Sequence, residues 1–436
     1  MTQRNRDILL LGQTLSLKSN PFQNDISKAV DYEKSGAVLI RQGKIAAAGP
    51  ADSLRAAVHT SDILDYGDKL ILPGFVDAHV HYPQTAIIAS WGKRLIEWLN
   101  HFTFPEEMLF CKADYATDIA ETYLDIAISN GTTSLATFTT IHPQSVDAIF
   151  EAAVSRGMAI VAGKTCMDRN APDRLCDTAK SAYDDSKALI EKWHGRERCT
   201  YAITPRFSPT STLDQLSALG LLWSEHPSCL MQTHLSEQIE ELQWVTSLFP
   251  KARDYLDTYE LTGLLGEGSI FGHAIHLTDR EKTRINEVGA SVVHCPTSNA
   301  FIGSGLFDMS TLSESGHRIG LATDIGGGSS FSMLRTMAAA YETGQLNAGP
   351  LHPAELLWLA TMGSATALRL EKEIGSIEAG KYADLVVIDL NSTPAISQRS
   401  AKAKDIWSAV FPTIMMGDDR AVYEVWINGQ RLKTVG

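Results

Sequence analysis

The chain has 436 residues, of which 44% are hydrophobic and 20% charged. This composition is typical of soluble globular proteins and excludes collagen-like, coiled-coil and disordered chains. The formal net charge is −13, so a sequence-independent grip on nucleic-acid phosphates is not expected. The length suggests about three ordinary domains, although a single α/β barrel would account for most of it.

The six cysteines are scattered and form no CxxC pair, which argues against a disulfide framework and against a thiolate zinc site. This distribution predicts a reducing, cytoplasmic setting. The first 15 residues are too polar for a signal sequence, and no apolar run approaches the roughly 18 residues of a membrane span. Neither secretion nor a membrane partner is expected.

In chain order, the first predicted elements are short strands over residues 8–11, 37–41 and 44–48, with Gln42-Gly43 as a hairpin turn. The C-terminal end has the same character, with strands predicted over 384–389 and 421–427 and a turn at Asn428-Gly429. Residues 1–68 and 375–436 are therefore expected to share one small composite β-sandwich domain.

Between these ends, over residues 69–374, short apolar runs alternate with helical stretches. The eight runs cover 69–79, 132–138, 158–162, 199–204, 229–234, 269–273, 291–294 and 319–323. Alternation of this kind predicts parallel strands joined by crossover helices, and eight such units close into a (β/α)8 TIM-like barrel. A doubly wound open sheet is the alternative.

One insertion interrupts this pattern, at about residues 82–114. It is rich in aromatic residues: Tyr82, Trp91, Trp98, Phe102, Phe104 and Phe110. It is interpreted as a packed surface subdomain or as a lid beside the carboxyl end of the first strand. A dimer interface is a third possibility.

Candidate metal ligands stand at the ends of several predicted strands. His79 and His81 flank one residue, so both side chains lie on the same face of the first strand. His234 ends the fifth strand, His273 the sixth and Asp324 the eighth. Each alone has an ordinary structural interpretation as a core histidine or a helix cap. Together they predict a metal site, because barrel active sites are built at strand carboxyl ends.

The proposed donors are imidazoles and a carboxylate without a thiolate, a set that suits Zn²⁺ best and also accepts Fe²⁺ or Mn²⁺. Glu237 follows His234 by three residues. If a helix begins directly after the strand, its carboxylate turns back towards the metal as a proton shuttle. The alternative is a surface glutamate in the acidic run Glu237, Glu240 and Glu241.

These residues carry a resemblance. The HxH pair, the two later histidines and the strand-eight aspartate resemble the amidohydrolase superfamily of metal-dependent hydrolases, and finer stretches resemble its guanine deaminase branch. Those stretches are residues 76–84 (Val-Asp-Ala-His-Val-His-Tyr-Pro-Gln), 97–105, 167–173, 204–208 (Thr-Pro-Arg-Phe-Ser), 233–237, 294–307 and 416–423. The resemblance spans essentially the whole chain.

The resemblance implies hydrolytic deamination of guanine to xanthine and ammonia in purine catabolism, with a metal-activated water. It implies one divalent metal on four ligands, because strand four ends without the lysine of binuclear relatives; these ligands are His79, His81, His234 and Asp324. Lys164 is interpreted as structural or solvated. Homodimers are common among the resembling enzymes, so a homodimer is expected.

The remaining implied roles concern catalysis and recognition. The catalytic residues are Glu237, His273 and Asp324, and the substrate-binding residues are Gln84, Arg206, Phe207, Glu237 and Asp324. Arg206 is suited to a carbonyl at C6, Phe207 to the ring face and Gln84 to another edge of the purine. Adenine is expected to be a poor substrate.

Three alternatives remain at this point. The enzyme would be an amidohydrolase deaminase of another aminated heterocycle, such as an s-triazine, cytosine or an adenosine derivative. The chain would be a metal-free scaffold that kept the barrel and lost the chemistry. The run Gly326-Gly327-Gly328-Ser329 would mark a nucleotide-binding module, although without a downstream GK[ST] it is better interpreted as a turn. The cytidine deaminase fold is set aside because its PCxxC motif is absent.

Overall fold

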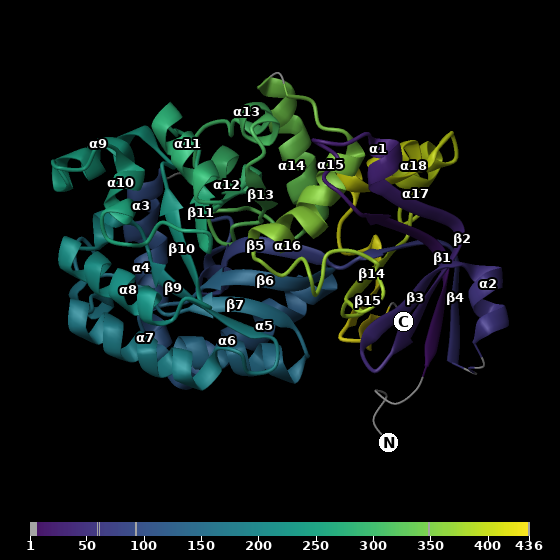
Figure 1. Ribbon diagram of the computed structural model, residues 1–436, viewed down its shortest axis with the longest axis horizontal. Coiled ribbons are helices and arrows are strands. Elements are labelled where there is room, and N and C mark those ends of the chain that lie inside the picture. The colour runs from purple at the N-terminus through teal and green to yellow at the C-terminus, as the bar shows by residue number, and fades with distance from the viewer. Residues whose placement is uncertain (1–6, 59, 61, 92–93, 348, 435–436) are drawn as a thin grey trace.

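The computed structural model describes residues 7–58, 60, 62–91, 94–347 and 349–434 (Figure 1). Residues 92 and 93 of the predicted insertion lie outside this part. Two sheets organise the molecule. A ring of parallel strands with surrounding helices lies on the left of Figure 1, and a sheet built from both ends of the chain lies on the right.

Eight parallel strands form the ring. In spatial order they are β5 (Phe75–His81), β6 (Thr132–Phe138), β7 (Ala159–Gly163), β9 (Cys199–Pro205), β10 (Leu230–Leu235), β11 (Ser269–His273), β12 (Ser291–His294) and β13 (Arg318–Leu321). A short extra strand, β8 (Thr165–Cys166), pairs with β9. The backbone N–H of Asp324 donates to the carbonyl of His79 at 3.1 Å, which joins the last unit to the first. The predicted barrel is confirmed, and the open-sheet alternative is wrong.

The strands form where the sequence supplies short apolar runs that are buried along their whole length. Both β5 and β6 are buried at every residue, as expected for parallel strands covered by helices. Side chains from around the whole ring share one buried cluster: Val76, Ala136, Val161, Ala202, Leu230, Ile270, Val293 and Ala322. The strand ends that carry the candidate residues are therefore held on a closed, packed frame.

Helices follow the strands and cover the barrel (Figure 1). They are α5 (Ala113–Ser129), α6 (Pro143–Ser155), α7 (Ala179–Trp193), α8 (Leu213–Glu225), α9 (Ile239–Leu248), α10 (Tyr255–Glu260), α11 (Asp279–Glu287), α12 (Pro296–Phe301), α13 (Met309–Glu314), α14 (Met333–Leu346), α15 (Pro353–Trp358) and α16 (Ser364–Ala367). Threonine side chains cap α7, α8 and α11 by accepting a backbone N–H of the first turn. Such caps satisfy otherwise unpaired donors and fix where each helix begins.

The second sheet has seven strands in the order β16-β15-β14-β4-β1-β2-β3. Their bounds are β1 (Ile8–Leu17), β2 (Val30–Arg41), β3 (Lys44–Pro50), β4 (Asp62–Pro73), β14 (Leu385–Ile388), β15 (Val422–Ile427) and β16 (Gln430–Thr434), with helices α1 (Ile26–Ala29), α2 (Ala51–Ala57), α17 (Pro394–Ser400) and α18 (Ile406–Met416) beside them. Val38 on β2 and Trp426 on β15 belong to one buried cluster. Because these strands stand near opposite ends of the sheet, the sheet folds over its own core.

The predicted first barrel strand, residues 69–79, is in fact two strands. β4 ends at Pro73, where it pairs with Leu385 of β14, and β5 begins at Phe75. Gly74 makes the transition beside β6, where a Cβ would lie 2.2 Å from Thr133 Oγ1. One continuous apolar run therefore serves two sheets, which hydrophobicity alone does not reveal.

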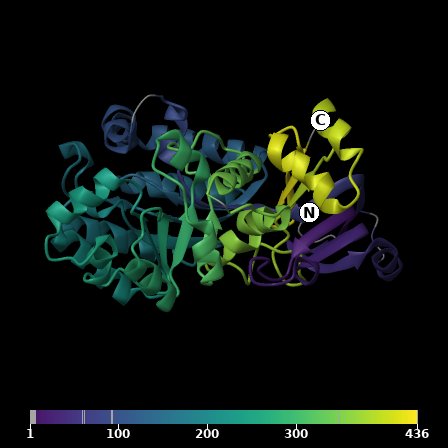
Figure 2. The same ribbon diagram turned by 90° about the horizontal axis from the view of Figure 1, so that it is seen from above.

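The predicted insertion consists of short helices that lie over the carboxyl ends of the strands. These are η2 (Tyr82–Ile87), α3 (Leu95–Trp98), the π-helical turn η3 (Leu99–Thr103), α4 (Phe104–Glu107) and η4 (Met108–Cys111). In Figure 2 this segment, in dark blue, rises at the upper left of the barrel.

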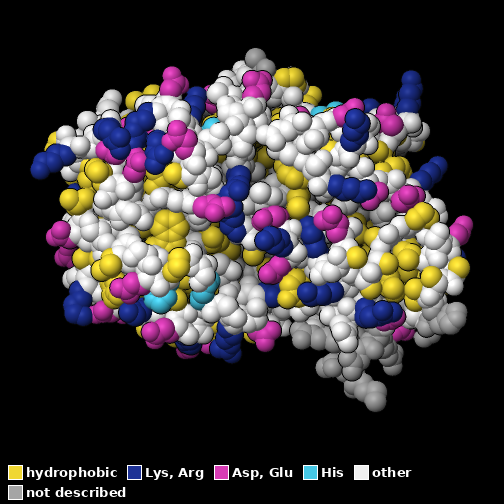
Figure 3. Space-filling view, viewed as in Figure 1, with side chains coloured by type: hydrophobic (Ala, Val, Ile, Leu, Met, Phe, Trp, Pro, Cys, Tyr) yellow, Lys and Arg dark blue, Asp and Glu magenta, His cyan; other side chains and the backbone are white. Residues whose placement is uncertain are grey.

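Acidic and basic side chains are interspersed over the face that Figure 3 shows. None of the helices that the structure describes is long and apolar enough to cross a membrane.

Candidate active site

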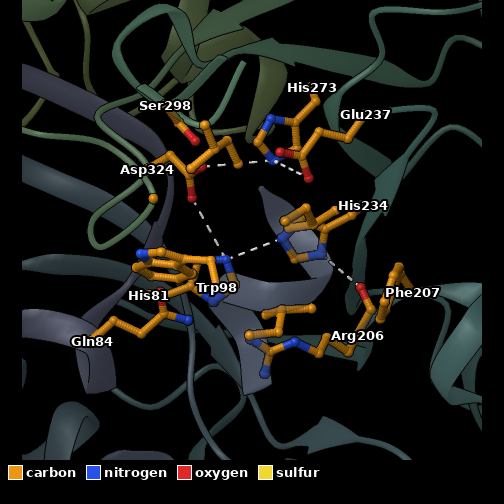
Figure 4. Close-up of a pocket in the computed structure, with 14 residues that line it drawn as sticks. His81, Gln84, Trp98, Arg206, Phe207, His234, Glu237, His273, Ser298 and Asp324 are labelled. Carbon is orange, nitrogen blue, oxygen red and sulfur yellow. Dashed lines mark hydrogen bonds and ion pairs between the residues drawn. The ribbon is translucent and has the colours of Figure 1, made fainter. Parts of the chain in front are cut away.

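The predicted metal-site residues come together at the carboxyl end of the barrel (Figure 4). His79 and His81 are the third-last and last residues of β5, His234 lies near the end of β10 and His273 at the end of β11. Asp324 lies three residues beyond β13. All five side chains are buried, with at most 9% of each residue exposed. The strand-end argument from sequence therefore places them correctly in space.

Their donor atoms converge. His81 Nε2 lies 3.0 Å from His234 Nε2, and Asp324 Oδ1 lies 3.5 Å from His79 Nε2 and 3.6 Å from His81 Nε2. Possible ligand atoms of His79, His81 and His234 lie within 4.8 Å of one another, and the same holds for His79, His273 and Asp324. Such a set of nitrogen and carboxylate donors is suited to a divalent metal.

The protonation of the histidines fits a metal as well. The Nδ1–H of His234 donates to the carbonyl of Arg206 at 2.7 Å, which leaves the lone pair on Nε2 facing the other donors. His79 Nε2 is buried and has no hydrogen-bond partner among the described residues. Burial holds the pKa of His79, His81 and His234 well below the ordinary value, and the charges of neighbouring histidines lower it further. These rings are therefore neutral, the form in which histidine binds metal.

The backbone around the site is unusual. Ser236, His273 and Asp324 have positive φ angles of 51°, 66° and 50°, a conformation that costs energy for residues other than glycine and that clusters at functional sites. Gly272 is required for a different reason, since a Cβ there would lie 2.6 Å from Cε1 of His79. The absence of a side chain at Gly272 on β11 therefore leaves room for the imidazole ring of His79.

Glu237 lies in the same pocket, although the predicted local geometry is wrong. α9 begins only at Ile239, and Glu237 lies in irregular backbone directly after a bend at Ser236 rather than on a helix. Its side chain is 2% exposed, and its carboxylate accepts a hydrogen bond from Ser304 Oγ at 3.0 Å. Burial raises the pKa of Glu237 to about 7, against the lowering effect of Ser304. The surface-glutamate alternative is therefore wrong, and the group is poised to exchange a proton near neutral pH.

His273 links this acid to the aspartate. Its Nε2 lies 3.6 Å from Glu237 Oε2 and 3.7 Å from Asp324 Oδ2, while its Nδ1 hydrogen-bonds Asn299 Oδ1 at 2.9 Å. Burial also raises the pKa of Asp324 to about 7. Glu237, His273 and Asp324 therefore form one continuous chain of polar groups along one side of the pocket.

The residues predicted to read the substrate form the opposite side (Figure 4). Gln84 lies in η2, and Arg206 and Phe207 directly follow β9. They surround a pocket with about 420 Å³ of empty space, lined also by His81, Leu95, Trp98, Leu99, His234, Glu237, His273, Ser298, Ile302, Asp324 and Gly327. That space includes the open mouth of the pocket, and imidazole, guanidinium, carboxyl and aromatic groups face it together.

Several residues in or beside the pocket were not predicted to belong to the site. Leu95, Trp98 and Leu99 come from the insertion, whose aromatic content gave a signal without specifying which side chains reach the site. Ser298 lines the pocket and Asn299 contacts His273; both lie in α12, beyond the strand end that the sequence argument considered. Glu107, which pairs with Arg206, gave no signal in the sequence.

The structure also places two features that the sequence analysis set apart from the site, Lys164 and the glycine run that begins at Gly326. Lys164 is buried and paired with the carboxylate of Asp177, and it is not among the residues that line the pocket. The run Gly326-Gly327-Gly328-Ser329 forms a turn after Asp324, in which the Gly328 N–H donates to the Asp324 carbonyl. It holds the rim of the pocket, as the turn interpretation predicts.

Comparison with known protein families agrees with this geometry. Residues 70–432 match the amidohydrolase family, and residues 36–57 match the imidazolonepropionase-like composite domain of bacteria. The chain belongs to the amidohydrolase family. Within it, the chain is 42% identical over 407 residues to the guanine deaminase of Escherichia coli K12, covering 93% of each chain.

Solved structures agree. The structure of E. coli guanine deaminase superposes with a TM-score of 0.96 at 39% identity, covering 98% of this chain and all of that one. Guanine deaminase from C. acetobutylicum, solved with guanine in its active site, gives a TM-score of 0.88 at 28% identity over 98% of this chain and all of that one.

Proposed function

We propose that this protein is a guanine deaminase, which hydrolyses guanine to xanthine and ammonia in purine catabolism. The observation that carries this proposal is one pocket that contains the metal donors, the buried carboxyl group of Glu237, and the side chains of Gln84, Arg206 and Phe207. The chain is also similar over 93% of its length to a curated guanine deaminase. The reaction breaks the bond between C2 and its exocyclic nitrogen. Water supplies the new oxygen at C2, and the amine leaves as ammonia.

The metal would be held by His79, His81, His234 and Asp324. Their chemistry favours Zn²⁺, with Fe²⁺ or Mn²⁺ as alternatives. When bound, such a metal lowers the pKa of a coordinated water and so makes a nucleophile available at neutral pH. The remaining steps are assigned to side chains of this chain.

Proton transfer is assigned to Glu237, Asp324 and His273. Asp324 orients the attacking water and accepts its proton. Glu237 protonates N3 of the ring as C2 becomes tetrahedral. It then takes the remaining proton of the attacking oxygen as the C2 carbonyl forms and delivers it to the departing amine, and the proton held by Asp324 returns to Glu237. The raised pKa of about 7 for Glu237 supports its role, since an acid is most effective near the working pH. His273 lies within 4 Å of both carboxylates and stabilises the attacking oxygen.

Recognition is assigned to Arg206, Gln84 and Phe207. Arg206 donates to O6 of guanine, Gln84 reads an adjacent edge, and the ring of Phe207 covers a face of the purine. Phe207 is held edge-on to His234, with ring centres 6.5 Å apart. A wrong base leaves buried polar groups of this wall unpaired, which discriminates strongly between substrates.

We also propose a cytoplasmic homodimer, with residues 1–68 and 375–436 as one composite domain and 69–374 as the other. The scattered cysteines support the compartment. The shared terminal sheet supports the composite domain.

A substrate panel tests the activity. Purified protein is assayed for ammonia release from guanine, adenine, cytosine and an s-triazine amine under identical conditions. The proposal expects a kcat/KM for guanine at least about 10³-fold above the others, by the logic of unpaired polar groups. Preference for any of the other rings would replace guanine as the substrate while keeping the site.

A further inference from the structure

We propose that Glu107 is a positioning residue that sets substrate specificity, because its carboxylate fixes the hydrogen-bonding groups of both Arg206 and Gln84. This inference rests on the proposed function. It concerns the wall of the pocket that lies opposite the metal donors and Glu237.

One buried carboxylate joins the two recognition residues. Arg206 Nη1 donates to Glu107 Oε1 at 3.0 Å and to Oε2 at 2.8 Å. Gln84 Nε2 donates to Glu107 Oε1 at 3.1 Å. The exposed fractions of Glu107, Gln84 and Arg206 are 0%, 2% and 3%. The three groups therefore act as one unit shielded from water, in which electrostatic contacts are strong.

The pairing leaves part of Arg206 available. A guanidinium has five N–H donors, and the contacts with Glu107 use only Nη1. The Arg206 side chain also lies over the ring of Phe104, 5.7 Å from its centre. Glu107 thus neutralises a buried cation and holds its plane, while donors on Nε and Nη2 remain for a carbonyl oxygen of the substrate.

The pairing also fixes which end of the Gln84 amide meets the substrate. The Nε2 group is turned towards Glu107, so Oε1 is turned the other way, where the backbone N–H of Gly326 donates to it at 3.3 Å. An amide oxygen has two lone pairs, so Gln84 can still accept an N–H from a ligand. The Gly326 N–H supports the same orientation from the other side, but its contact is longer and uncharged, so the Glu107 carboxylate is the stronger of the two partners that hold the amide.

Together these contacts give the wall a fixed order of a donor followed by an acceptor. Guanine presents the matching edge, a C6 carbonyl beside an N1–H. Adenine presents the reverse, an amino group beside an unprotonated N1. Glu107 is therefore the group that makes the wall complementary to an oxo-purine edge, although it does not line the pocket itself.

The test compares Glu107→Gln with the matched control Glu106→Gln, which makes the same change one residue earlier on α4. For each protein, guanine KM and kcat are measured together with the inhibition constant of 2-aminopurine, which keeps the C2 amine but lacks both O6 and N1–H. The expected result for Glu107→Gln is a KM for guanine raised about tenfold, kcat within about threefold of wild type, and an unchanged 2-aminopurine inhibition constant. Glu106→Gln should leave all three unchanged.

A merely structural role predicts something else. If guanine and 2-aminopurine binding weaken together, or if neither changes, the inference is overturned. Glu107→Asp, which keeps the charge but withdraws the carboxylate, provides the same comparison should the glutamine variant fail to fold. Failure of the proposed function is a separate outcome, because it would appear as wild-type protein without activity on guanine.

Discussion

The two walls of the pocket are built in different ways. On one wall, His79, His81 and His234 extend from the ends of barrel strands that are hydrogen-bonded to their neighbours on both sides. On the other, Gln84, Trp98 and Glu107 come from an insertion of helices that are each four to six residues long, and they meet Arg206 and Phe207, which directly follow β9. The comparison suggests that the barrel topology fixes the chemistry, whereas side-chain packing in the insertion fixes recognition.

This difference has a physical basis. Helices this short are not stable by themselves in water, so the insertion depends on contacts such as that of Glu107 with Arg206. The strand ends depend on a closed sheet and a packed core. Changes on the barrel wall should therefore act on metal and turnover, and changes on the insertion wall should act on KM.

The largest effect is expected from His234→Ala. Loss of one imidazole should reduce bound metal from about one to below about 0.1 per chain and bring guanine turnover to background, while the barrel stays folded. Elemental analysis and circular dichroism measure the two properties. The exposed His101, on the insertion, supplies the control His101→Ala, which should retain both metal and activity. Full metal in His234→Ala would remove His234 from the ligand set.

Glu237→Gln should reduce guanine turnover nearly as much as His234→Ala does, but it should leave the metal content unchanged. Replacing the carboxyl group by an amide removes the proton carrier, which is worth roughly 10² to 10⁴ in rate, and leaves the donor atoms of the metal site in place. Elemental analysis beside the rate assay separates the two. The exposed Glu240 offers the matched change Glu240→Gln, expected to be neutral. Metal loss in Glu237→Gln would show that the residue is a ligand and not the proton shuttle.

Gly272→Ala tests the barrel wall without touching a donor. The new Cβ would lie 2.6 Å from His79 Cε1, so the imidazole must move. A change of this kind beside a ligand should weaken metal affinity by about 10- to 100-fold. Titration with a competing chelator measures this affinity. Wild-type metal affinity in this variant would contradict the tight seating of His79.

Trp98→Ala is the mildest change and acts on the other wall. Its ring is 3% exposed and lines the pocket, so truncation should remove an aromatic contact and raise the KM for guanine by about tenfold. The metal content should not change, because Trp98 comes from the insertion. A large loss of metal in this variant would mean that the two walls are not independent.

The sequence predicted one of these walls much better than the other. Residues such as His79 and Asp324 could be placed because side-chain alternation along a strand and the common carboxyl edge of parallel strands determine where they point. Arg206 could be identified through resemblance, but its partner could not. Glu107 lies 99 positions from Arg206 in the chain. A pattern of neighbouring residues cannot predict a contact between positions so far apart.

Local geometry was the other limit. The bend that brings Glu237 into the pocket depends on a positive φ at Ser236. The presence of a serine does not predict that conformation. The split at Gly74 was hidden for a similar reason, since the apolar run continues on both sides while the hydrogen-bonding partners change.

The most direct test of the account is ammonia release from guanine by purified protein whose metal content has been measured, with a chelator-treated sample alongside. Formation of xanthine is followed by its ultraviolet spectrum. The account predicts turnover that disappears on chelation and returns when the divalent metal is restored. Absence of turnover in protein carrying a full complement of metal would contradict it.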